Sequence, residues 1–194
     1  MKQIKLEIDG KTVEAQEGMT VLQVARQADI YIPTLCYHEQ LSPYGGCRLC
    51  TVEIEKKGKT RLVASCVYPV EEGLSVRTET EAVIKVRKMV LELLLPLSPT
   101  GPIETLAKKY GVQKSRFKDE PTGCILCGLC VRYCEEIKGI SAVTFVNRGT
   151  ERDIAFVPEV ASETCCVCRE CFPLCPSGKI ATLCLDGTEF APLA

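Results

Sequence analysis

Apolar and polar residues alternate along the stretch KQIKLEIDGKTVEAQEG, on both sides of Asp9 and Gly10. An alternation with a period of two is typical of a half-buried strand, and Asp-Gly is a favoured pair for a tight turn between two strands. The start of the chain therefore predicts a β-hairpin.

The pattern changes to a helical period in MTVLQVARQADI, whose apolar residues can share one face. Thr20 and Gln23 have the spacing of a capping box at the start of this helix. After a cysteine-bearing loop, TVEIE, TRLVASC and LSVRTE predict three more short strands. Two strands, a helix, a loop and further strands indicate a small α+β unit of the β-grasp kind over residues 1–78.

A longer helix is predicted from TETEAVIKVRKMVLELLLPLSP. Thr78 and Glu81 have the spacing of a capping box, and Pro96 ends the helical run. The expected apolar face consists of Val83, Val86, Val90 and Leu93.

A second short helix is predicted from PTGPIETLAKKYGVQ, with Pro102 near its start and Gly111 past its end. We expect the two helices to form a linker over residues 79–120.

Composition narrows the class of protein. The chain has 194 residues, 46% of them hydrophobic, and a formal net charge of −1 without a basic block that would favour nucleic acid or an anionic membrane surface. The N-terminus lacks the apolar core of a signal peptide, and the longest apolar stretch, MVLELLLPL, is too short to span a bilayer. The 14 cysteines are an unusually large number. In a reducing compartment their thiols would not form disulfides and would stay free to bind metals. We therefore expect a cytoplasmic metalloprotein.

Eight of the cysteines form two runs with the spacing C-x2-C-x2-C-x3-C, displaced by 41 residues. The runs are Cys124, Cys127, Cys130, Cys134 and Cys165, Cys168, Cys171, Cys175. Between them, two strand-like segments around residues 147–150 predict a hairpin. We expect residues 121–194 to form a second, cysteine-rich domain.

This spacing is that of bacterial ferredoxins with two [4Fe–4S] clusters, in which the fourth cysteine of each run ligates the other cluster. It predicts that one cubane is held by Cys124, Cys127, Cys130 and Cys175. The second cubane would be held by Cys134, Cys165, Cys168 and Cys171. The alternative is a structural zinc module, but zinc ligands normally come as two C-x2-C pairs with a longer spacer, which these runs fit poorly.

The N-terminal unit carries its own set, Cys36-x10-Cys47-x2-Cys50-x15-Cys66. Four thiolates on a β-grasp unit suit a [2Fe–2S] cluster with two cysteines per iron. We expect Gly45 and Gly46 to let the backbone bend and bring amide groups near the sulfurs. A Rieske centre needs two histidines, and His38 is the only one in the chain, so we expect His38 to be a surface residue of the loop.

Two cysteines lie outside these sets. Cys166 is next to a predicted ligand and could replace it, although the symmetry of the runs favours Cys165. Cys184 is expected to be a small buried apolar residue. The sequence contains neither G-x-G-x-x-G nor a P-loop pattern, and it offers no nucleophile–histidine pairing beyond the single histidine. We therefore predict no catalytic residues, and a chain that carries electrons without binding the molecule that supplies them.

The C-x10-C-x2-C…C unit, the linker and the runs CILCGLCVRYCEEIKGISAVTFVNRGTE and CCVCRECFPLCPSG together resemble one family. It is the N-terminal iron–sulfur region of the large electron-input subunit of bacterial complex I. The chain is similar also to the diaphorase small subunit of NAD-linked hydrogenases and to related subunits of electron-bifurcating hydrogenases and formate dehydrogenases. The resemblance implies a β-grasp [2Fe–2S] ferredoxin domain, a helical linker and a bacterial-type 2[4Fe–4S] ferredoxin domain.

One departure from the family lies in the linker. The family's additional [4Fe–4S] site, with one His and three Cys, has no counterpart in LLLPLSPTGPIETLAKKYG. We therefore expect a shortened relay with one [2Fe–2S] cluster and two [4Fe–4S] clusters.

The resemblance also implies partners. A separate flavin subunit would react with NAD(P), and this chain would pass electrons between it and a catalytic subunit of the hydrogenase or formate dehydrogenase type. Because 194 residues leave no room for a catalytic domain after the second cubane motif, we expect a non-catalytic subunit. The alternatives are a structural zinc module and a free-standing polyferredoxin-like carrier. A net charge of −1 gives the carrier little support, since such carriers often dock through acidic surfaces.

Overall fold

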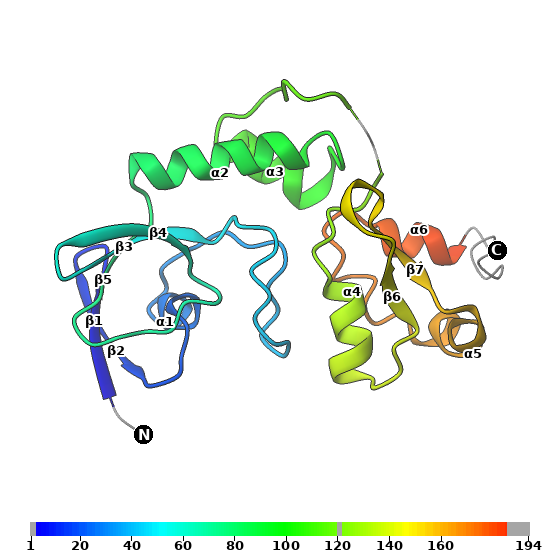
Figure 1. Cartoon of the computed structure of the whole chain (residues 1–194), viewed down its shortest axis with the longest axis horizontal. Helices are drawn as coiled ribbons and strands as arrows, with labels where there is room; N and C mark the ends of the chain where they lie inside the picture. The colour runs from blue at the N-terminus through cyan, green and yellow to red at the C-terminus, as the bar shows by residue number, and fades with distance from the viewer. Residues whose placement is uncertain (1–2, 120–121, 186–194) are drawn as a thin grey trace.

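The computed structural model describes residues 3–119 and 122–185. Figure 1 shows two units, an N-terminal one that contains a five-stranded sheet and a C-terminal one of short helices and a hairpin. Helices α2 (Glu81–Leu94) and α3 (Gly101–Lys109) bridge the two units at the top of the view. The mixture of helices and sheets agrees with the predicted α+β class. The predicted second domain begins at residue 121 and ends at residue 194, and its residues 121 and 186–194 lie outside the described residues.

The N-terminal sheet has the strand order β2-β1-β5-β3-β4, in which β1 and β5 are parallel and the other neighbours antiparallel. Its strands are β1 (Gln3–Ile8), β2 (Lys11–Gln16), β3 (Thr51–Lys56), β4 (Lys59–Ala64) and β5 (Ser75–Arg77). The predicted hairpin is confirmed. Asp9 and Gly10 both have positive φ, 49° and 80°, which is the geometry of the tight turn that suits twisted strands.

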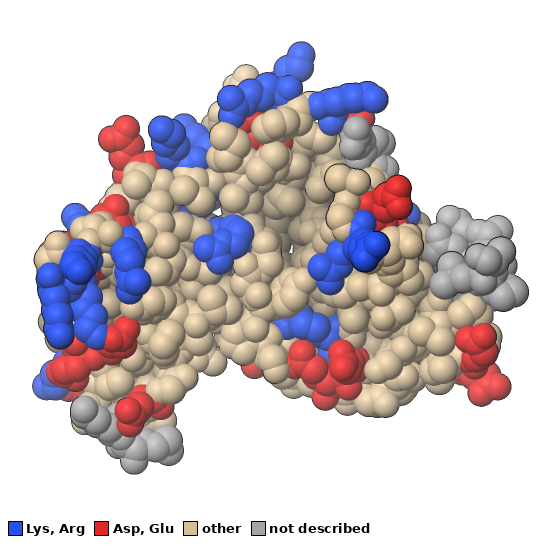
Figure 2. Space-filling model, in the orientation of Figure 1, with Lys and Arg blue, Asp and Glu red and all other residues tan. Residues whose placement is uncertain are grey.

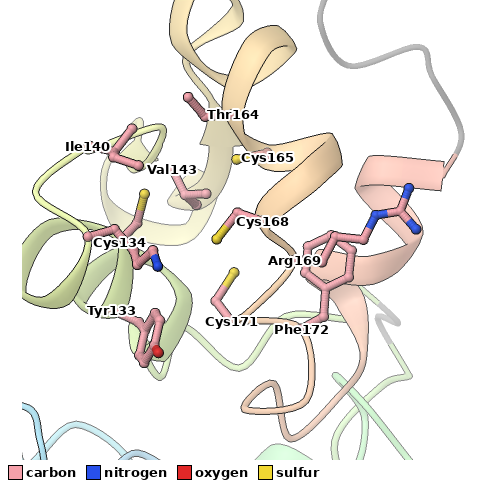
Figure 3. A pocket seen from close by; sticks show the side chains of 11 residues that line it. Tyr133, Cys134, Ile140, Val143, Thr164, Cys165, Cys168, Arg169, Cys171 and Phe172 are labelled. Carbon is pink, nitrogen blue, oxygen red and sulfur yellow. The ribbon is translucent and has the colours of Figure 1, made fainter.

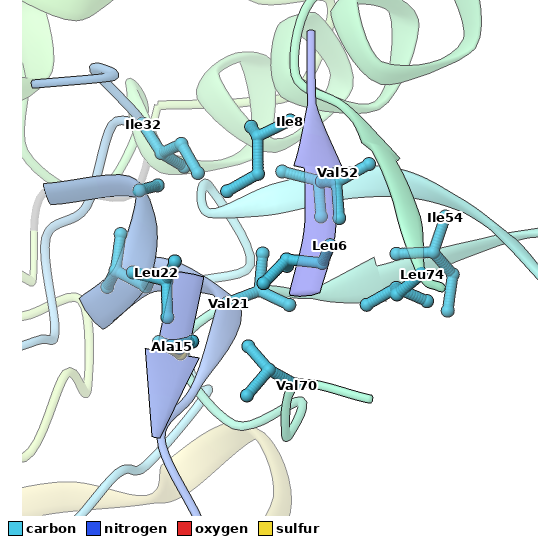
Figure 4. Packing of buried hydrophobic residues seen from close by; sticks show 14 of the residues in the cluster. Leu6, Ile8, Ala15, Val21, Leu22, Ile32, Val52, Ile54, Val70 and Leu74 are labelled. Carbon is cyan, nitrogen blue, oxygen red and sulfur yellow. The ribbon is translucent and has the colours of Figure 1, made fainter. Parts of the chain in front are cut away.

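The core of this unit lies between the sheet and α1 (Val21–Gln27). Alternate residues of β1 are buried, as its pattern predicts. In Figure 4, Val21 and Leu22 of α1 face Leu6 of β1 and Val52 of β3. The predicted capping box is also confirmed, because the Thr20 hydroxyl accepts from the Gln23 backbone N–H and the Gln23 side chain accepts from the Thr20 N–H.

The prediction for the start of α2 is wrong by two residues. The cap is Thr80, whose hydroxyl accepts a hydrogen bond from the Val83 N–H at 3.3 Å. Thr78 is held elsewhere, because its N–H and hydroxyl donate to the Asp9 carboxylate at 2.8 and 2.6 Å. The turn of the first hairpin therefore fixes the strand that precedes the helix, and the helix begins only after it.

The predicted apolar face of α2 is also partly wrong. Val83 is buried, but Val86 and Val90 are only half-buried and Leu93 is 48% exposed. The fully buried positions of α2 are Val83, Arg87 and Leu91. The buried face of α2 is rotated relative to the predicted one because it includes the side chain of Arg87. A pattern of apolar residues does not indicate that an arginine is buried.

The linker helices form a joint between the two units. Leu91 of α2 and Ile103 of α3 are both fully buried. They belong to one apolar cluster, here called the joint cluster, whose buried members are Leu35, Cys36, Leu41, Cys47, Leu49, Leu91, Ile103, Leu106, Tyr110, Cys127 and Leu129. The predicted second helix is confirmed, with Pro102 in its first turn. The linker therefore fills its interior with apolar side chains that pack on cysteine loops from both units.

The C-terminal unit contains the predicted hairpin, in which β6 (Val143–Val146) and β7 (Asp153–Phe156) pair antiparallel. Its helical segments are α4 (Leu129–Arg132), the π-helix η1 (Tyr133–Ile137), the 3-10 turn η2 (Gly149–Glu151), α5 (Pro158–Cys168) and α6 (Lys179–Leu185). The helices α5 and α6 were not predicted from the sequence. The cysteines and small residues of these segments hide the apolar period of a helix.

Charges of both signs are interspersed on the face shown in Figure 2, with Lys and Arg over the linker helices and over the β3–β4 side, and Asp and Glu beside them. This distribution agrees with the absence of a basic block in the sequence. Among the described residues, no helix is long and apolar enough to cross a membrane.

Candidate metal centres

The four cysteines of the N-terminal unit lie together as two pairs. The Sγ atoms of Cys50 and Cys66 are 3.3 Å apart. Cys36 pairs with Cys47, whose backbone N–H donates to the Cys36 Sγ at 3.3 Å. All four side chains are buried. Two adjacent pairs of thiols are the donor set that a [2Fe–2S] cluster requires.

The sheet and the loop position these thiols. Cys50 comes directly before β3 and Cys66 follows β4, and the Ser65 N–H donates to the Cys50 carbonyl oxygen at 3.1 Å. The Gly46 N–H also hydrogen-bonds to Cys36, as the glycine pair predicted. Gly45 has a φ of +69°, and a Cβ on Gly46 would lie 2.5 Å from the Tyr44 ring. The loop can therefore wrap closely only with glycine at these positions.

The thiols of each pair titrate differently. Hydrogen bonding from Cys47 lowers the pKa of Cys36, and hydrogen bonding from Cys66 lowers the pKa of Cys50. The same bonds, together with burial, raise the pKa of Cys47 and Cys66. One thiol of each pair is therefore poised to become a thiolate, which is the form that binds iron.

In the C-terminal unit, a cavity is lined by Cys134, Cys165, Cys168 and Cys171. Figure 3 shows their sulfur atoms pointing toward a common space, with Cys134 on one side and the other three on the opposite side. The cavity is partly open to solvent, with about 350 Å³ of space between its lining atoms, and its wall is otherwise mainly apolar. Four converging thiols in such a wall fit a cubane cluster, which is bound by four thiolates.

Local backbone geometry brings these four residues together. Cys134 lies in η1, where the helix that carries Cys130 widens from an α-helix to a π-helix. Short π-helical segments often occur at functional sites. The Ala142 N–H donates to the Cys134 Sγ at 3.2 Å. On the other side, Arg169 ends α5 in the left-handed conformation with a φ of +50°, and the chain turns there toward Cys171.

The other four cysteines of the two runs are Cys124, Cys127, Cys130 and Cys175. Burial chiefly raises the pKa of Cys130, and the charges of Cys127, Cys171, Cys175 and Cys124 raise it further. The charge of Cys175 also raises the pKa of Cys124 and Cys127, again after burial. Cys134 of the first run thus lines one cavity with three cysteines of the second run, and the charge of Cys175 reaches the first run.

Burial raises the pKa of most of these thiols, to about 12 for Cys127 and Cys171 and to about 11 for Cys165. Cys175 differs, because burial is outweighed by hydrogen bonds from the backbone N–H of Ile180 and from Ser177, and its pKa is lowered. Buried thiolates without a cation are costly, so these sites favour metal binding with release of protons.

The three groups of cysteines are neighbours. Cys36, Cys47 and Cys127 belong to the joint cluster, so one apolar cluster connects the N-terminal pairs to the first run. Cys171 acts on the pKa of Cys130, which connects the two groups of the C-terminal unit.

Other potential ligands add no further site among the described residues. Within residues 3–119 and 122–185, no three His, Cys, Asp or Glu side chains have an arrangement suited to a single metal ion. Cys184 is buried, as predicted, with 7% exposure. The side chain of Cys166 lies outside the described residues. His38 is half-buried rather than on the surface, with its ring edge-on to Tyr133 at a centroid distance of 6.2 Å.

Two arginines next to the sites were missed from the sequence. Arg87 is fully buried, and it donates to the carbonyl oxygens of Leu49 and Thr51, on either side of Cys50. Arg132 donates to the Cys36 carbonyl oxygen from the other unit. The position of Arg132 inside the first cysteine run was the only available signal, and Arg87 gave none because it occupies an ordinary helical position.

Residues 1–81 match a family described as the 2Fe-2S iron-sulfur cluster binding domain. The chain is 34% identical to the NADH-ubiquinone oxidoreductase 75 kDa subunit of Reclinomonas americana, over 90% of this chain and 29% of that protein. It is 33% identical to the NADP-reducing hydrogenase subunit HndD of Solidesulfovibrio fructosivorans, over 93% of this chain and 36% of that protein. The chain spans about a third of the length of these curated relatives.

A solved structure is also similar to this chain, and the match covers most of both chains. A chain from the crystal structure of an NAD+-reducing [NiFe]-hydrogenase in the H2-reduced state matches with a TM-score of 0.71 and 30% sequence identity. The match covers 79% of this chain and 75% of that chain.

Proposed function

Because the chain belongs to the family of iron–sulfur subunits of NAD(P)-linked oxidoreductases, we propose that it is an electron-relay subunit of such a complex. The observation that carries the proposal is the cavity in which Cys134 of the first run meets three cysteines of the second run. The paired thiols of the N-terminal unit support it as well.

The residues divide into three proposed ligand sets. The N-terminal [2Fe–2S] domain holds its cluster through Cys36 and Cys47 on one iron and Cys50 and Cys66 on the other. The first [4Fe–4S] cluster is held by Cys124, Cys127, Cys130 and Cys175. The second is held by Cys134, Cys165, Cys168 and Cys171. The domains are residues 1–78, a linker over 79–120 without the His-Cys site, and a bacterial-type ferredoxin domain over 121–194.

When bound, these clusters accept and release single electrons. The chain's own residues prepare the sites. The N–H groups of Gly46 and Cys47 donate toward Cys36, and the N–H of Ala142 donates to Cys134, so backbone dipoles stabilise negative charge on the sulfurs. Leu91 and Ile103 exclude water from the joint cluster, where cysteines of both units meet. A dry, fixed connection between neighbouring sites is what a relay needs.

The proposed partners follow from the family. A flavin subunit that binds NAD(P) would stand on one side of the relay and a catalytic subunit of the hydrogenase or formate dehydrogenase type on the other. We place the complex in the cytoplasm, because a reducing compartment keeps the described cysteines available as thiols.

The test is to isolate the full chain without oxygen and to count iron, acid-labile sulfide and zinc per polypeptide. The three ligand sets require about ten irons and as many sulfides. About six irons would contradict one cubane, and stoichiometric zinc with little sulfide would favour the structural zinc module. Purification from its native source without any flavoprotein would favour the free-standing carrier.

A further inference from the structure

Arg132 connects the two units at the N-terminal cysteine loop. It lies in the spacer between Cys130 and Cys134, yet its guanidinium reaches the other unit. Its Nη1 donates to the Ser42 carbonyl oxygen at 2.6 Å, and its Nη2 donates to the Cys36 carbonyl oxygen at 2.8 Å. Its guanidinium carbon also lies 4.9 Å from the centre of the Tyr44 ring.

Neighbouring contacts fix the same loop on the same helical face. The Ser42 N–H donates to the Glu136 carboxylate at 2.7 Å, so both polar backbone groups of Ser42 are held by the C-terminal unit. His38 meets Tyr133 edge-on. The loop that carries Cys36 is therefore docked on α4 and η1, the helical segment that contains Cys130 and Cys134 of the first run.

One nitrogen of the guanidinium has no hydrogen-bond partner. Among the residues that the structure describes, the Arg132 Nε is the only buried side-chain nitrogen or oxygen without a hydrogen-bond partner. Buried donors are normally paired, so an unpaired one calls for an explanation. The hydrogen bond from the Arg132 Nη2 to the Cys36 carbonyl oxygen places this positive charge at a proposed ligand residue.

We propose that Arg132 is a positioning residue that raises the reduction potential of the N-terminal [2Fe–2S] cluster and holds its loop against the first cubane motif. The inference rests on the proposed function above. One-electron reduction adds one negative charge to the cluster. A fixed cation at a ligand residue stabilises the reduced form more than the oxidised form, and an arginine keeps its charge at all relevant pH values.

The test is a potentiometric titration of the loaded full-length chain, following the electron paramagnetic resonance signal of the [2Fe–2S] cluster at temperatures where the cubane signals are broadened. In Arg132→Gln, we expect the equilibrium to shift about tenfold toward the oxidised cluster, which corresponds to a potential about 59 mV lower for a one-electron couple. In Arg132→Lys, which keeps the charge but loses the planar fork, we expect a shift of about twofold or less.

Arg26→Gln is the matched control. Arg26 also lies against a tyrosine beside the N-terminal loop, with its guanidinium carbon 4.6 Å from the Tyr37 ring centre. Its hydrogen bonds go to Glu39 and Thr34 and to none of the cysteines. Its loss removes the same charge, and the expected shift is less than about twofold because an exposed charge is screened.

Three results would overturn the proposal: an unchanged potential in Arg132→Gln with full iron content, an equal shift in Arg26→Gln, or a tenfold shift in Arg132→Lys. If Arg132→Gln fails to load the [2Fe–2S] cluster, Arg132→Lys decides. Loading with a near-normal potential supports a role for the charge, and failure to load overturns it. A wild-type chain with zinc and no sulfide would instead contradict the proposed function itself.

Discussion

The two units bury their cysteines in opposite ways. In the N-terminal unit, 17 buried residues form the core, and only Cys50 and Cys66 among them are cysteines. In the described part of the C-terminal unit, five of 13 buried core residues are cysteines. The first core is built by alternating strands and an amphipathic helix, and we expect it to be stable without metal. The second core is built around thiols, and because it has few apolar residues we expect it to depend on bound metal.

Removing the iron should therefore affect the two units differently, and we expect it to change the protein more than any of the substitutions below. After chelation under reducing conditions, we expect amide hydrogens in α5, β6 and β7 to lose most of their exchange protection. Those in β1 and β3 should remain protected, because their apolar core is intact. Hydrogen exchange with mass spectrometry on the loaded and iron-free chain checks this. Equal loss of protection in both units would contradict the comparison.

Two cysteine variants provide a matched control for the C-terminal unit. Cys134 and Cys184 are buried to a similar extent, 8% and 7% exposed, in the same core. Cys134→Ser should lower the iron content by about four, whereas Cys184→Ser should leave it unchanged. Equal iron loss in both variants would mean that core packing, and not ligation, governs the iron content.

Arg87 of α2 attaches the linker to the N-terminal unit. Besides the carbonyl oxygens of Leu49 and Thr51, its guanidinium contacts Glu79 at 2.8 Å and the Tyr110 hydroxyl at 2.9 Å. We expect Arg87→Met to lower the free energy of unfolding of the N-terminal unit by about 3–5 kcal/mol, because buried polar partners lose their donor. Denaturant unfolding followed by amide exchange in β3 measures this loss.

Glu79→Gln is the control for this prediction. The Glu79 side chain is 52% exposed, so its loss should cost less than about 1 kcal/mol. An equal loss in both variants would show that the ion pair, and not the bonds to the backbone carbonyls, is what Arg87 contributes.

The smallest expected effect is at the start of α2. Thr80→Ala should lower the free energy of unfolding by about 1 kcal/mol, because the Val83 N–H loses its acceptor. Thr80→Ser keeps the hydroxyl and should change it by less than about 0.5 kcal/mol. Thermal unfolding of the loaded chain compares the two variants, and equal losses would show that the threonine methyl group, not the cap, is responsible.

Local chemistry predicted the elements whose signals are local. The Asp9-Gly10 turn and the Thr20 cap depend on residues within four positions of each other, and both are present. The prediction of the two cysteine runs rests on their spacing, which can be read directly from the sequence. Thr78 and Thr80 could not be distinguished in this way, because Asp9, far away in the chain, holds the first and leaves the second to cap the helix.

The buried arginines show the limit more clearly. The apolar residues of α2 predicted a buried face through Val86 and Val90. Instead, Arg87 donates to the backbone carbonyl oxygens of Leu49 and Thr51, and the side of α2 that carries Arg87 faces inward. These acceptors lie 36 and 38 positions earlier in the chain, at the start of β3 and just before it. Arg132 likewise finds its partners about 90 positions away. Such contacts exist only once the fold has brought the units together.

The proposed ligand sets have a consequence for how the protein is made. Each C-terminal set takes cysteines from both runs, so neither is complete before the second run has been synthesised. The N-terminal pairs, in contrast, are complete once Cys66 has appeared. On this proposal iron delivery has a temporal order, in which the N-terminal site can be filled before either C-terminal site.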